Sequence, residues 1–145
     1  MIPKSLPPST PIRVLCVDDQ EDITTVVRML ITEESNMQCV GCLASVEHLV
    51  EDVRALPAPP DVVILDATMP GRSPMMALEE LAGACPKTRT LIYSAHNDPA
   101  FIRHAKLAGA WGWVCKDDEP TSLLRAVREV ADGRPVWPVG PKRTS

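Results

Sequence analysis

The sequence predicts an α/β protein in which helices cover both faces of a doubly wound, five-stranded parallel sheet. Five short apolar segments occur along the 145 residues, and a stretch with apolar residues at helical spacing follows each of them. Five strand–helix repeats in one chain require parallel strands joined by right-handed crossovers. Such crossovers place helices on both faces of a single sheet.

The five predicted strands are short and mostly aliphatic. They cover residues 12–17, 37–42, 61–65, 88–93 and 110–115. The third is apolar after its first residue, as expected of a central parallel strand that is buried on both faces. Polar residues directly follow four of the strands: Asp18, Asp66, Ser94 and Lys116.

Helical spacing and a capping residue define the first three helices. The first covers residues 21–34, and its expected core face is formed by Ile23, Val26, Val27, Leu30 and Ile31. Ser45 is the expected N-cap of the second helix, which ends before Pro57. The third helix covers residues 74–84.

Proline and glycine delimit the last two helices. Proline suits the first helical turn, because its missing N–H is not needed there, and glycine suits the position after the last turn. The two helices are therefore expected to begin at Pro99 and at Pro120, with Gly109 as the stop of the first and Gly133 just past the end of the second.

Composition and charge exclude several classes of protein. Apolar residues make up 45% of the chain, enough for one core, and only 3% are aromatic, so aliphatic side chains must fill it. The net charge is −4 and the basic residues are scattered, which argues against a nucleic-acid-binding surface. Neither a membrane-spanning run nor a signal peptide occurs, so we expect a cytoplasmic protein without membrane contact.

One domain is expected between two tails. Residues 1–11 are rich in proline and are expected to form a disordered leader, and the domain itself covers residues 12–134. Residues 135–145 are expected to be a C-terminal tail, or a linker to an output domain that is absent from this chain.

The five cysteines do not predict a disulfide framework, because the number is odd and Cys16, Cys39 and Cys115 lie in apolar segments. The spacing of Cys39 and Cys42 also occurs in redox and zinc sites. A redox pair, however, lies where a strand meets a helix, and a zinc site needs further ligands. Core packing is therefore the favoured interpretation of this pair.

Polar side chains gather at the carboxyl ends of the predicted strands, where open α/β sheets bind ligands. Five residues lie there: Asp18, Asp19, Asp66, Ser94 and Lys116. Three close carboxylates repel one another unless a cation neutralises them, and oxygen ligands suit Mg²⁺. The amine and the hydroxyl suit phosphoryl oxygens, and an aspartate can form an acyl phosphate. The site therefore predicts phosphoryl transfer to the central carboxylate, Asp66.

Four motifs at these strand ends resemble those of the response-regulator receiver domains of two-component signalling. They are the Asp18-Asp19 pair, Asp66 followed by Met69-Pro70-Gly71, Ser94-Ala95, and Lys116. The resemblance covers nearly the whole predicted domain. It implies a CheY-like, flavodoxin-like fold with the strand order 2-1-3-4-5.

The resemblance implies a catalytic or metal-binding role for each acidic residue. Asp66 is implied as the phosphoacceptor, and Lys116 as the charge partner of the phosphoryl group. The implied Mg²⁺ ligands are the side chains of Asp18, Asp19 and Asp66, with the backbone carbonyl of Thr68.

Further residues are implied in switching and tuning. Ser94 is the hydroxyl that moves toward the phosphoryl group, and Trp113 stands at the position of the switch aromatic. Trp111 and Trp113 alternate along the fifth strand and are expected on the same face of the sheet. Thr68 and His96 lie at the mouth of the site, and we hypothesise that they tune the lifetime of the acyl phosphate.

The segment GAWGWVCKD, residues 109–117, resembles the NarL/LuxR-type subclass, in which Lys-Asp replaces the more common Lys-Pro. Members of this subclass normally carry a C-terminal helix-turn-helix domain that binds DNA. DNA is therefore expected as a partner only through a domain that is not present in this chain. The loop from Met69 to Met75 departs from the family, because it lacks the Asp-Gly pair that receivers often carry there.

The resulting hypothesis is a phosphorylation-controlled switch and not an enzyme, with at most self-phosphorylation and self-dephosphorylation. A histidine kinase or a phosphotransfer protein is the implied phosphoryl donor. The surface of the fourth helix, fifth strand and fifth helix is expected to change, and to bind a partner, a second receiver in a homodimer, or an output domain that regulates transcription.

Three alternatives stay open. A pseudo-receiver would bind partners without phosphorylation. An aspartyl-nucleophile phosphatase commonly needs a second acid two residues after the nucleophile, where Thr68 stands here. A nucleotide-binding α/β module would carry a glycine-rich loop after the first strand, where Asp18-Asp19-Gln20 stands instead.

Overall fold

A computed structural model describes residues 10–138, and it has the predicted fold. Five parallel strands form one sheet in the order β2-β1-β3-β4-β5. The strands are β1 (Ile12–Val17), β2 (Met37–Leu43), β3 (Val62–Leu65), β4 (Arg89–Ser94) and β5 (Gly112–Cys115). Residues 1–9 of the predicted leader and residues 139–145 of the predicted tail lie outside the described residues.

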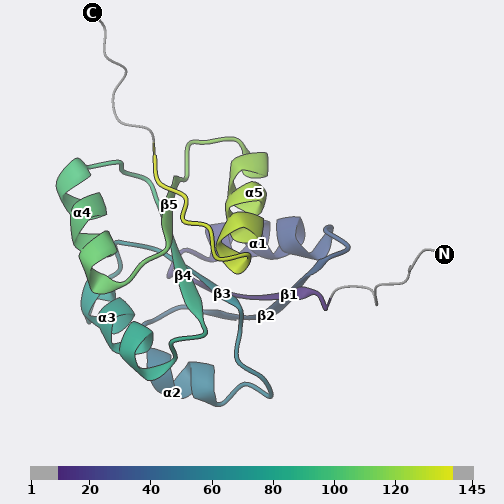
Figure 1. Cartoon of the computed structure of the whole chain (residues 1–145), viewed down its shortest axis with the longest axis horizontal. Helices are drawn as coiled ribbons and strands as arrows, with labels where there is room; N and C mark the ends of the chain where they lie inside the picture. Colours follow the sequence, from purple (N-terminus) through teal and green to yellow (C-terminus); the bar gives the residue numbers. More distant parts are fainter. Residues whose placement is uncertain (1–9, 139–145) are drawn as a thin grey trace, which may run out of the picture.

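Helices cover both faces of this sheet (Figure 1). They are α1 (Glu21–Thr32), α2 (Leu49–Arg54), α3 (Pro74–Ala84), α4 (Pro99–Ala108) and α5 (Pro120–Ala131). The helices α2, α3 and α4 pack on one face, and α1 and α5 pack on the other. The predicted fold class and the strand order implied by the resemblance are therefore confirmed.

The central strand β3 contributes to both cores. Val63 and Leu65 pack beneath α2, α3 and α4, whereas Val62 and Ile64 pack beneath α1 and α5. None of the four is more than 1% exposed, which explains the uninterrupted apolar sequence of this strand. A strand held on both faces fixes the position of the residue that follows it, Asp66.

Helix α4 shows how the local sequence sets the ends of an element. It begins at Pro99, and the preceding Asp98 accepts a hydrogen bond from the Ala100 N–H at 3.0 Å through Oδ1. It ends at Ala108 and is capped by Gly109, whose φ of +111° is readily adopted by glycine. A Cβ at Gly109 would lie 2.8 Å from the Ala82 Cβ, so glycine also permits the close approach of α3.

Two expectations about helices are wrong in detail. Ser45 is not the N-cap of α2, because its Oγ accepts a hydrogen bond from the Glu47 N–H at 3.0 Å in a turn before the helix begins. Val26 on α1 is 51% exposed, whereas Val27 and Ile31 form the buried face. Spacing predicts which residues share a side of a helix, but not how far the helix rotates about its own axis.

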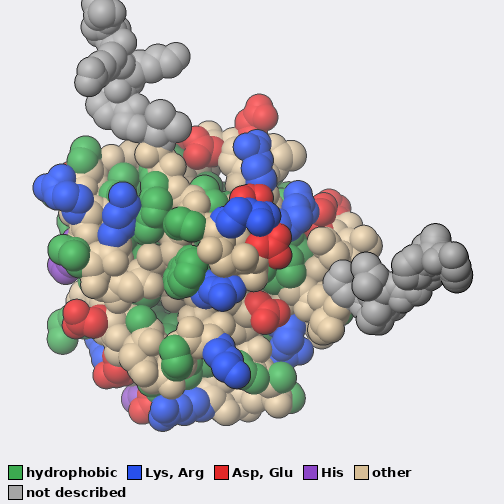
Figure 2. Space-filling view, in the orientation of Figure 1, with side chains coloured by type: hydrophobic (Ala, Val, Ile, Leu, Met, Phe, Trp, Pro, Cys, Tyr) green, Lys and Arg blue, Asp and Glu red, His purple; other side chains and the backbone are tan. Residues whose placement is uncertain are grey.

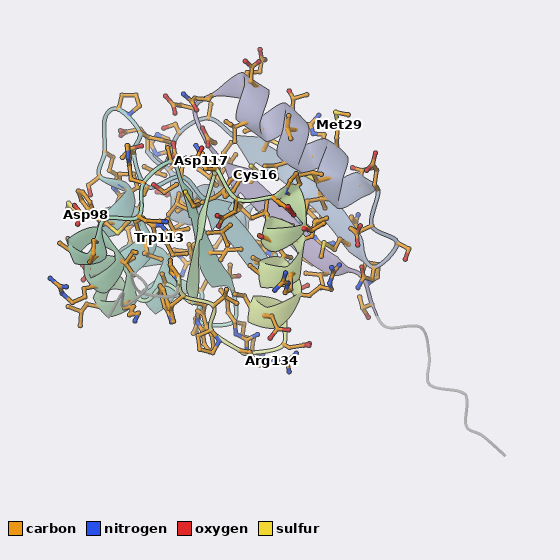
Figure 3. All side chains as sticks on the ribbon, turned by 90° about the horizontal axis from the view of Figure 1, so that it is seen from above. Cys16, Met29, Asp98, Trp113, Asp117 and Arg134 are labelled. Atoms are coloured by element: carbon orange, nitrogen blue, oxygen red, sulfur yellow. The ribbon has the colours of Figure 1, made fainter. Side chains whose placement is uncertain are left out.

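The expected common face of Trp111 and Trp113 is also wrong. Trp113 is 2% exposed in the core beneath α4, whereas Trp111 packs against the opposite core, with the Arg89 guanidinium 4.8 Å from its ring centroid. Trp111 precedes β5, which begins at Gly112, so strand alternation does not govern its direction. Figure 3 shows Trp113 on the α4 side of the sheet and Cys16 on the α1 side.

An irregularity in β2 explains the placement of two cysteines. β2 contains one extra residue, Val40, opposite β1. This bulge lets Cys39 and Cys42 both pack partly against the core beneath α1 and α5, as free thiols. The core-packing interpretation of this pair is therefore confirmed.

Charged side chains of both signs are interspersed on the face shown in Figure 2, which carries no large basic patch. In residues 10–138, no helix is long and apolar enough to cross a membrane.

Candidate functional site

The ends of β1 and β3 bring the predicted carboxylates together. Asp18 and Asp66 follow neighbouring strands whose last residues, Val17 and Leu65, are paired. The Asp66 N–H donates to the Val17 carbonyl at 2.9 Å, so the strand pairing continues into the site. Carboxylate oxygens of Asp18, Asp19 and Asp66 all lie within 4.8 Å of one another. Asp18 and Asp66 are each only 3% exposed, whereas Asp19 is exposed.

Lys116 supplies a positive charge to this cluster. Its Nζ lies 2.8 Å from Asp18 Oδ2 and 3.5 Å from Asp66 Oδ1, and its side chain is 12% exposed. The Lys116 N–H donates to the Ser94 carbonyl at 2.7 Å, which ties the end of β5 to the end of β4. The lysine therefore links two buried carboxylates that lie 50 and 98 positions before it in the sequence. The geometry of the site depends on the whole sheet.

The pKa values of Asp66 and Lys116 reflect this burial. Burial raises the pKa of the Asp66 carboxyl above its ordinary value, and the negative charge of Asp18 raises it further. The hydrogen bond from the Thr68 amide and the positive charge of Lys116 lower this pKa, but not enough to cancel the effect of burial. Burial alone lowers the pKa of Lys116, but its hydrogen bond to Asp18 and the charge of Asp66 raise the pKa overall. Lys116 thus stays protonated, while burial makes the ionised form of Asp66 less favourable than it is in water.

Backbone amides hold both buried carboxylates in place. The Gln20 N–H donates to Asp18 Oδ1 at 2.8 Å, and the Thr68 N–H donates to Asp66 Oδ1 at 3.2 Å. Each aspartate therefore accepts from the amide two residues further on, a turn that orients its carboxylate at the strand end. The side chain of Thr68 itself is exposed.

Ser94 ends β4 at the same edge of the sheet and is 1% exposed. Its Oγ accepts a hydrogen bond from the His96 N–H at 3.1 Å, and His96 itself is exposed. The His96 carbonyl accepts a hydrogen bond from Trp113 Nε1 at 2.9 Å. Sequence analysis missed this link between the Ser94 loop and Trp113, because a contact across 17 positions leaves no local pattern.

The assembled site favours chemistry that is controlled by charge. Lys116 can neutralise only one of the three carboxylates of Asp18, Asp19 and Asp66, so the site has room for a hard cation with oxygen ligands. The Ser94 hydroxyl adds a hydrogen-bond donor at the same edge. These properties suit an incoming group that carries several anionic oxygens.

Comparison with known families gives a direct result. The sequence model of the response regulator receiver domain family matches residues 14–128. The chain belongs to this family. The resemblance inferred from the strand-end motifs is therefore confirmed, and members of the family are in general signalling domains and not enzymes.

Two curated relatives indicate the subclass. The nitrate/nitrite response regulator protein NarL of Escherichia coli K12 is 31% identical over 126 residues, which cover 87% of this chain and 57% of NarL. The DNA-binding transcriptional activator DevR/DosR of Mycobacterium tuberculosis is 32% identical over 123 residues, which cover 85% of this chain and 56% of that protein. The chain thus spans little more than half the length of these relatives.

Solved structures agree with this grouping. The signal receiver domain of a NarL response regulator from Mycobacterium tuberculosis has a TM-score of 0.80 at 29% identity, covering 87% of this chain and 100% of that one. A LuxR-family response regulator from an Aurantimonas species has a TM-score of 0.81 at 28% identity, covering 88% and 89%. The expected receiver fold and NarL/LuxR-type subclass are both confirmed.

Proposed function

We propose that this receiver domain accepts a phosphoryl group on Asp66 from a histidine kinase or a phosphotransfer protein, with Mg²⁺ present. The observation that carries the proposal is the position of Asp66. It is buried, has an oxygen within 4.8 Å of two further carboxylates, and lies 3.5 Å from the Lys116 ammonium. A buried carboxylate that is poorly solvated by water and lies beside a fixed cation is suited to act as a nucleophile toward phosphorus.

Mg²⁺ fits the available donor set. Asp18, Asp19 and Asp66 offer three oxygen ligands on one edge of the sheet, and Asp19 is open to solvent, where further ligands can be water. We propose the backbone carbonyl of Thr68 as an additional ligand. The bound ion would supply positive charge against the phosphoryl oxygens.

Lys116 and Ser94 are proposed to hold the transferred group. An Asp66 oxygen attacks phosphorus, so that an O–P bond forms while the N–P bond to the donor histidine breaks and the imidazole leaves. The protonated Lys116 pairs with a phosphoryl oxygen. The Ser94 hydroxyl accepts from the His96 N–H in this structure and keeps its own proton for donation to the phosphoryl group.

Thr68 and His96 are proposed to tune the lifetime of the acyl phosphate. Both are exposed, and their backbone amides bond the two groups that matter, Asp66 and Ser94. Their side chains would therefore control how water reaches the phosphorus. The rate of phosphate loss from wild type and His96→Ala tests this idea, and equal rates would remove His96 from it.

The output is proposed from the relatives. Phosphorylation would change the face formed by α4, β5 and α5, through which the domain would control a partner or pair with a second receiver. Within a longer regulator, the same face would control a DNA-binding domain. Support comes from DevR/DosR, which is named a DNA-binding transcriptional activator and is nearly twice the matched length.

Labelling with acetyl phosphate tests the proposed function. We expect incorporation of a phosphoryl group with Mg²⁺ and little with a chelator, and borohydride reduction should convert Asp66 alone to homoserine. Labelling at another aspartate would remove Asp66 as the acceptor. Absence of any label would instead favour a phosphorylation-independent interaction module, and steady turnover of a phosphate ester would favour a phosphatase.

A further inference from the structure

The open edge of β5 is covered by the chain that follows α5. The Val136 N–H donates to the Trp111 carbonyl at 3.1 Å, and the Trp113 N–H donates to the Val136 carbonyl at 2.9 Å. Val136 thereby forms a parallel bridge with Gly112. We call residues 135–138 the strap, because they use the backbone groups of β5 that an added strand would use.

The packing of the strap depends on a glycine in β5. A Cβ at Gly112 would lie 2.7 Å from the Val136 carbonyl oxygen and 2.8 Å from Leu91 Cδ1, so a larger residue would displace the strap or the core beneath it. The close approach therefore requires the hydrogen atom that only glycine has in place of a side chain.

Trp137 anchors the strap on the other side of β5, at α4. Its half-buried indole packs against the core that contains Trp113, and Lys106 Nζ on α4 lies 4.8 Å from its ring centroid. On the α5 side, a cavity of about 250 Å³ lies beside the strap, and both polar residues such as Arg125 and Glu129 and apolar residues, including Trp137 itself, line it. The strap is thus held by two backbone hydrogen bonds, by Trp137 and by the partly buried Val136, and the cavity leaves it incompletely packed on the α5 side.

A continuous series of contacts joins the strap to the candidate site. Ser94 Oγ accepts from the His96 N–H, the His96 carbonyl accepts from Trp113 Nε1, and the Trp113 N–H donates to the Val136 carbonyl. Trp113 therefore contacts both regions: its indole N–H donates to the His96 carbonyl near the site, and its backbone N–H donates to the Val136 carbonyl in the strap.

We propose that the strap is a releasable cover of the β5 edge, and that phosphorylation of Asp66 loosens it. This coupling rests on the proposed function. Movement of the Ser94 hydroxyl toward a phosphoryl group shifts the loop to His96 and removes the carbonyl partner of the Trp113 indole. Once the strap leaves, the Trp111 carbonyl and the Trp113 N–H lose their Val136 partners and become accessible at the β5 edge.

Amide hydrogen exchange on the full chain tests the proposal. In wild type treated with acetyl phosphate and Mg²⁺, the Trp113 and Val136 amides should exchange roughly tenfold faster than in the untreated protein. Asp66→Asn under the same treatment should show no change. Unchanged exchange in protein that intact mass shows to be phosphorylated would overturn the coupling.

Trp137→Ala separates the strap from the proposed function. Without its aromatic anchor the strap should open in unphosphorylated protein, so the same two amides should again exchange faster while phosphoryl incorporation stays as in wild type. Gly112→Ala should give the same change in exchange by steric displacement. Slow exchange in Trp137→Ala would show that the strap is not a releasable cover, whether or not Asp66 accepts a phosphoryl group.

If wild type takes up no phosphoryl group, the proposed function fails and the coupling fails with it. The proposal that the strap is a releasable cover of β5 would then be tested by amide exchange in Trp137→Ala alone. The two failures are therefore distinguishable.

Discussion

Two margins of the same sheet are built in different ways. One is the carboxyl ends of the strands, where the acidic cluster lies, and the other is the edge strand β5, which the strap covers. In the cluster, Asp18 and Asp66 directly follow paired strands, so two short apolar segments fix their positions. At the β5 edge, Trp111 and Trp113 meet Val136 only after a helix has turned the chain back. The first arrangement follows from where parallel strands end, and the second from how α5 returns the chain to the sheet, so the two should respond differently to substitution.

The largest effect is expected for Lys116→Met, which removes the only cation that contacts both Asp18 and Asp66 within the described residues. Two buried carboxylates would lose their partner, and the free energy of unfolding without Mg²⁺ should fall by about 3 kcal/mol. Phosphoryl incorporation should fall with it. Urea unfolding and acetyl phosphate labelling measure the two effects.

Lys106→Met is the matched control at the other margin. This lysine is exposed and contacts the Trp137 ring, so its loss should cost at most about 1 kcal/mol and leave labelling unchanged. Equal costs for the two lysine substitutions would contradict the contrast drawn between the two margins.

Trp113→Phe should have an intermediate effect, since Trp113 connects the two margins. Phenylalanine keeps an aromatic ring in the core but removes the Nε1 donor to the His96 carbonyl, so we expect a loss of about 1–2 kcal/mol. Amide exchange should rise at His96 and at Val136 together. A rise at only one of them would break the proposed connection.

A smaller, pH-dependent effect is expected for Asp66→Asn. Burial raises the pKa of the Asp66 carboxyl, so the folded protein binds this proton more tightly than the unfolded chain. Its contribution favours folding below the ordinary carboxyl pKa and is lost as the pH rises through the raised value. Without Mg²⁺, Asp66→Asn should therefore be more stable than wild type at neutral pH.

Urea unfolding of both proteins across acidic and neutral pH measures this difference. The advantage of Asp66→Asn should shrink as the pH falls, and Mg²⁺ should reduce it at neutral pH by stabilising only the wild type. An advantage that grows toward low pH would contradict the direction given for the Asp66 pKa.

The smallest effect is expected for Ser45→Ala, a position outside both margins. Its Oγ accepts from the Glu47 N–H in an exposed turn, so the change should cost less than about 0.5 kcal/mol. A true N-cap would cost about 1 kcal/mol. Thermal unfolding of the variant thus also checks where α2 begins.

The acidic cluster could be predicted from the sequence, because its residues follow short apolar segments that are easily recognised as strands. Asp66 follows five residues that read as a central strand, and Lys116 follows the strand that ends at Cys115. The fold class followed from the same periodicity, whereas the strand order came from the family resemblance. Neither step needed information about which distant residues touch.

The β5 margin could not be predicted in the same way. Trp111 and Trp113 pack on opposite faces because β5 begins at Gly112, two residues later than the expected start at residue 110, so that Trp111 lies before the strand. The pairing of Val136 with β5 depends on how α5 returns the chain to the sheet, and no motif marks it. The rotation that exposes Val26 is likewise set by packing against the sheet.

The most direct test of the central claim is the intact mass of the full chain after treatment with acetyl phosphate and Mg²⁺, with Asp66→Asn as the control. We predict a mass increase of one phosphoryl group in wild type and none in Asp66→Asn. An unchanged wild-type mass, or an equal increase in both proteins, would contradict the assignment of Asp66 as the phosphoacceptor.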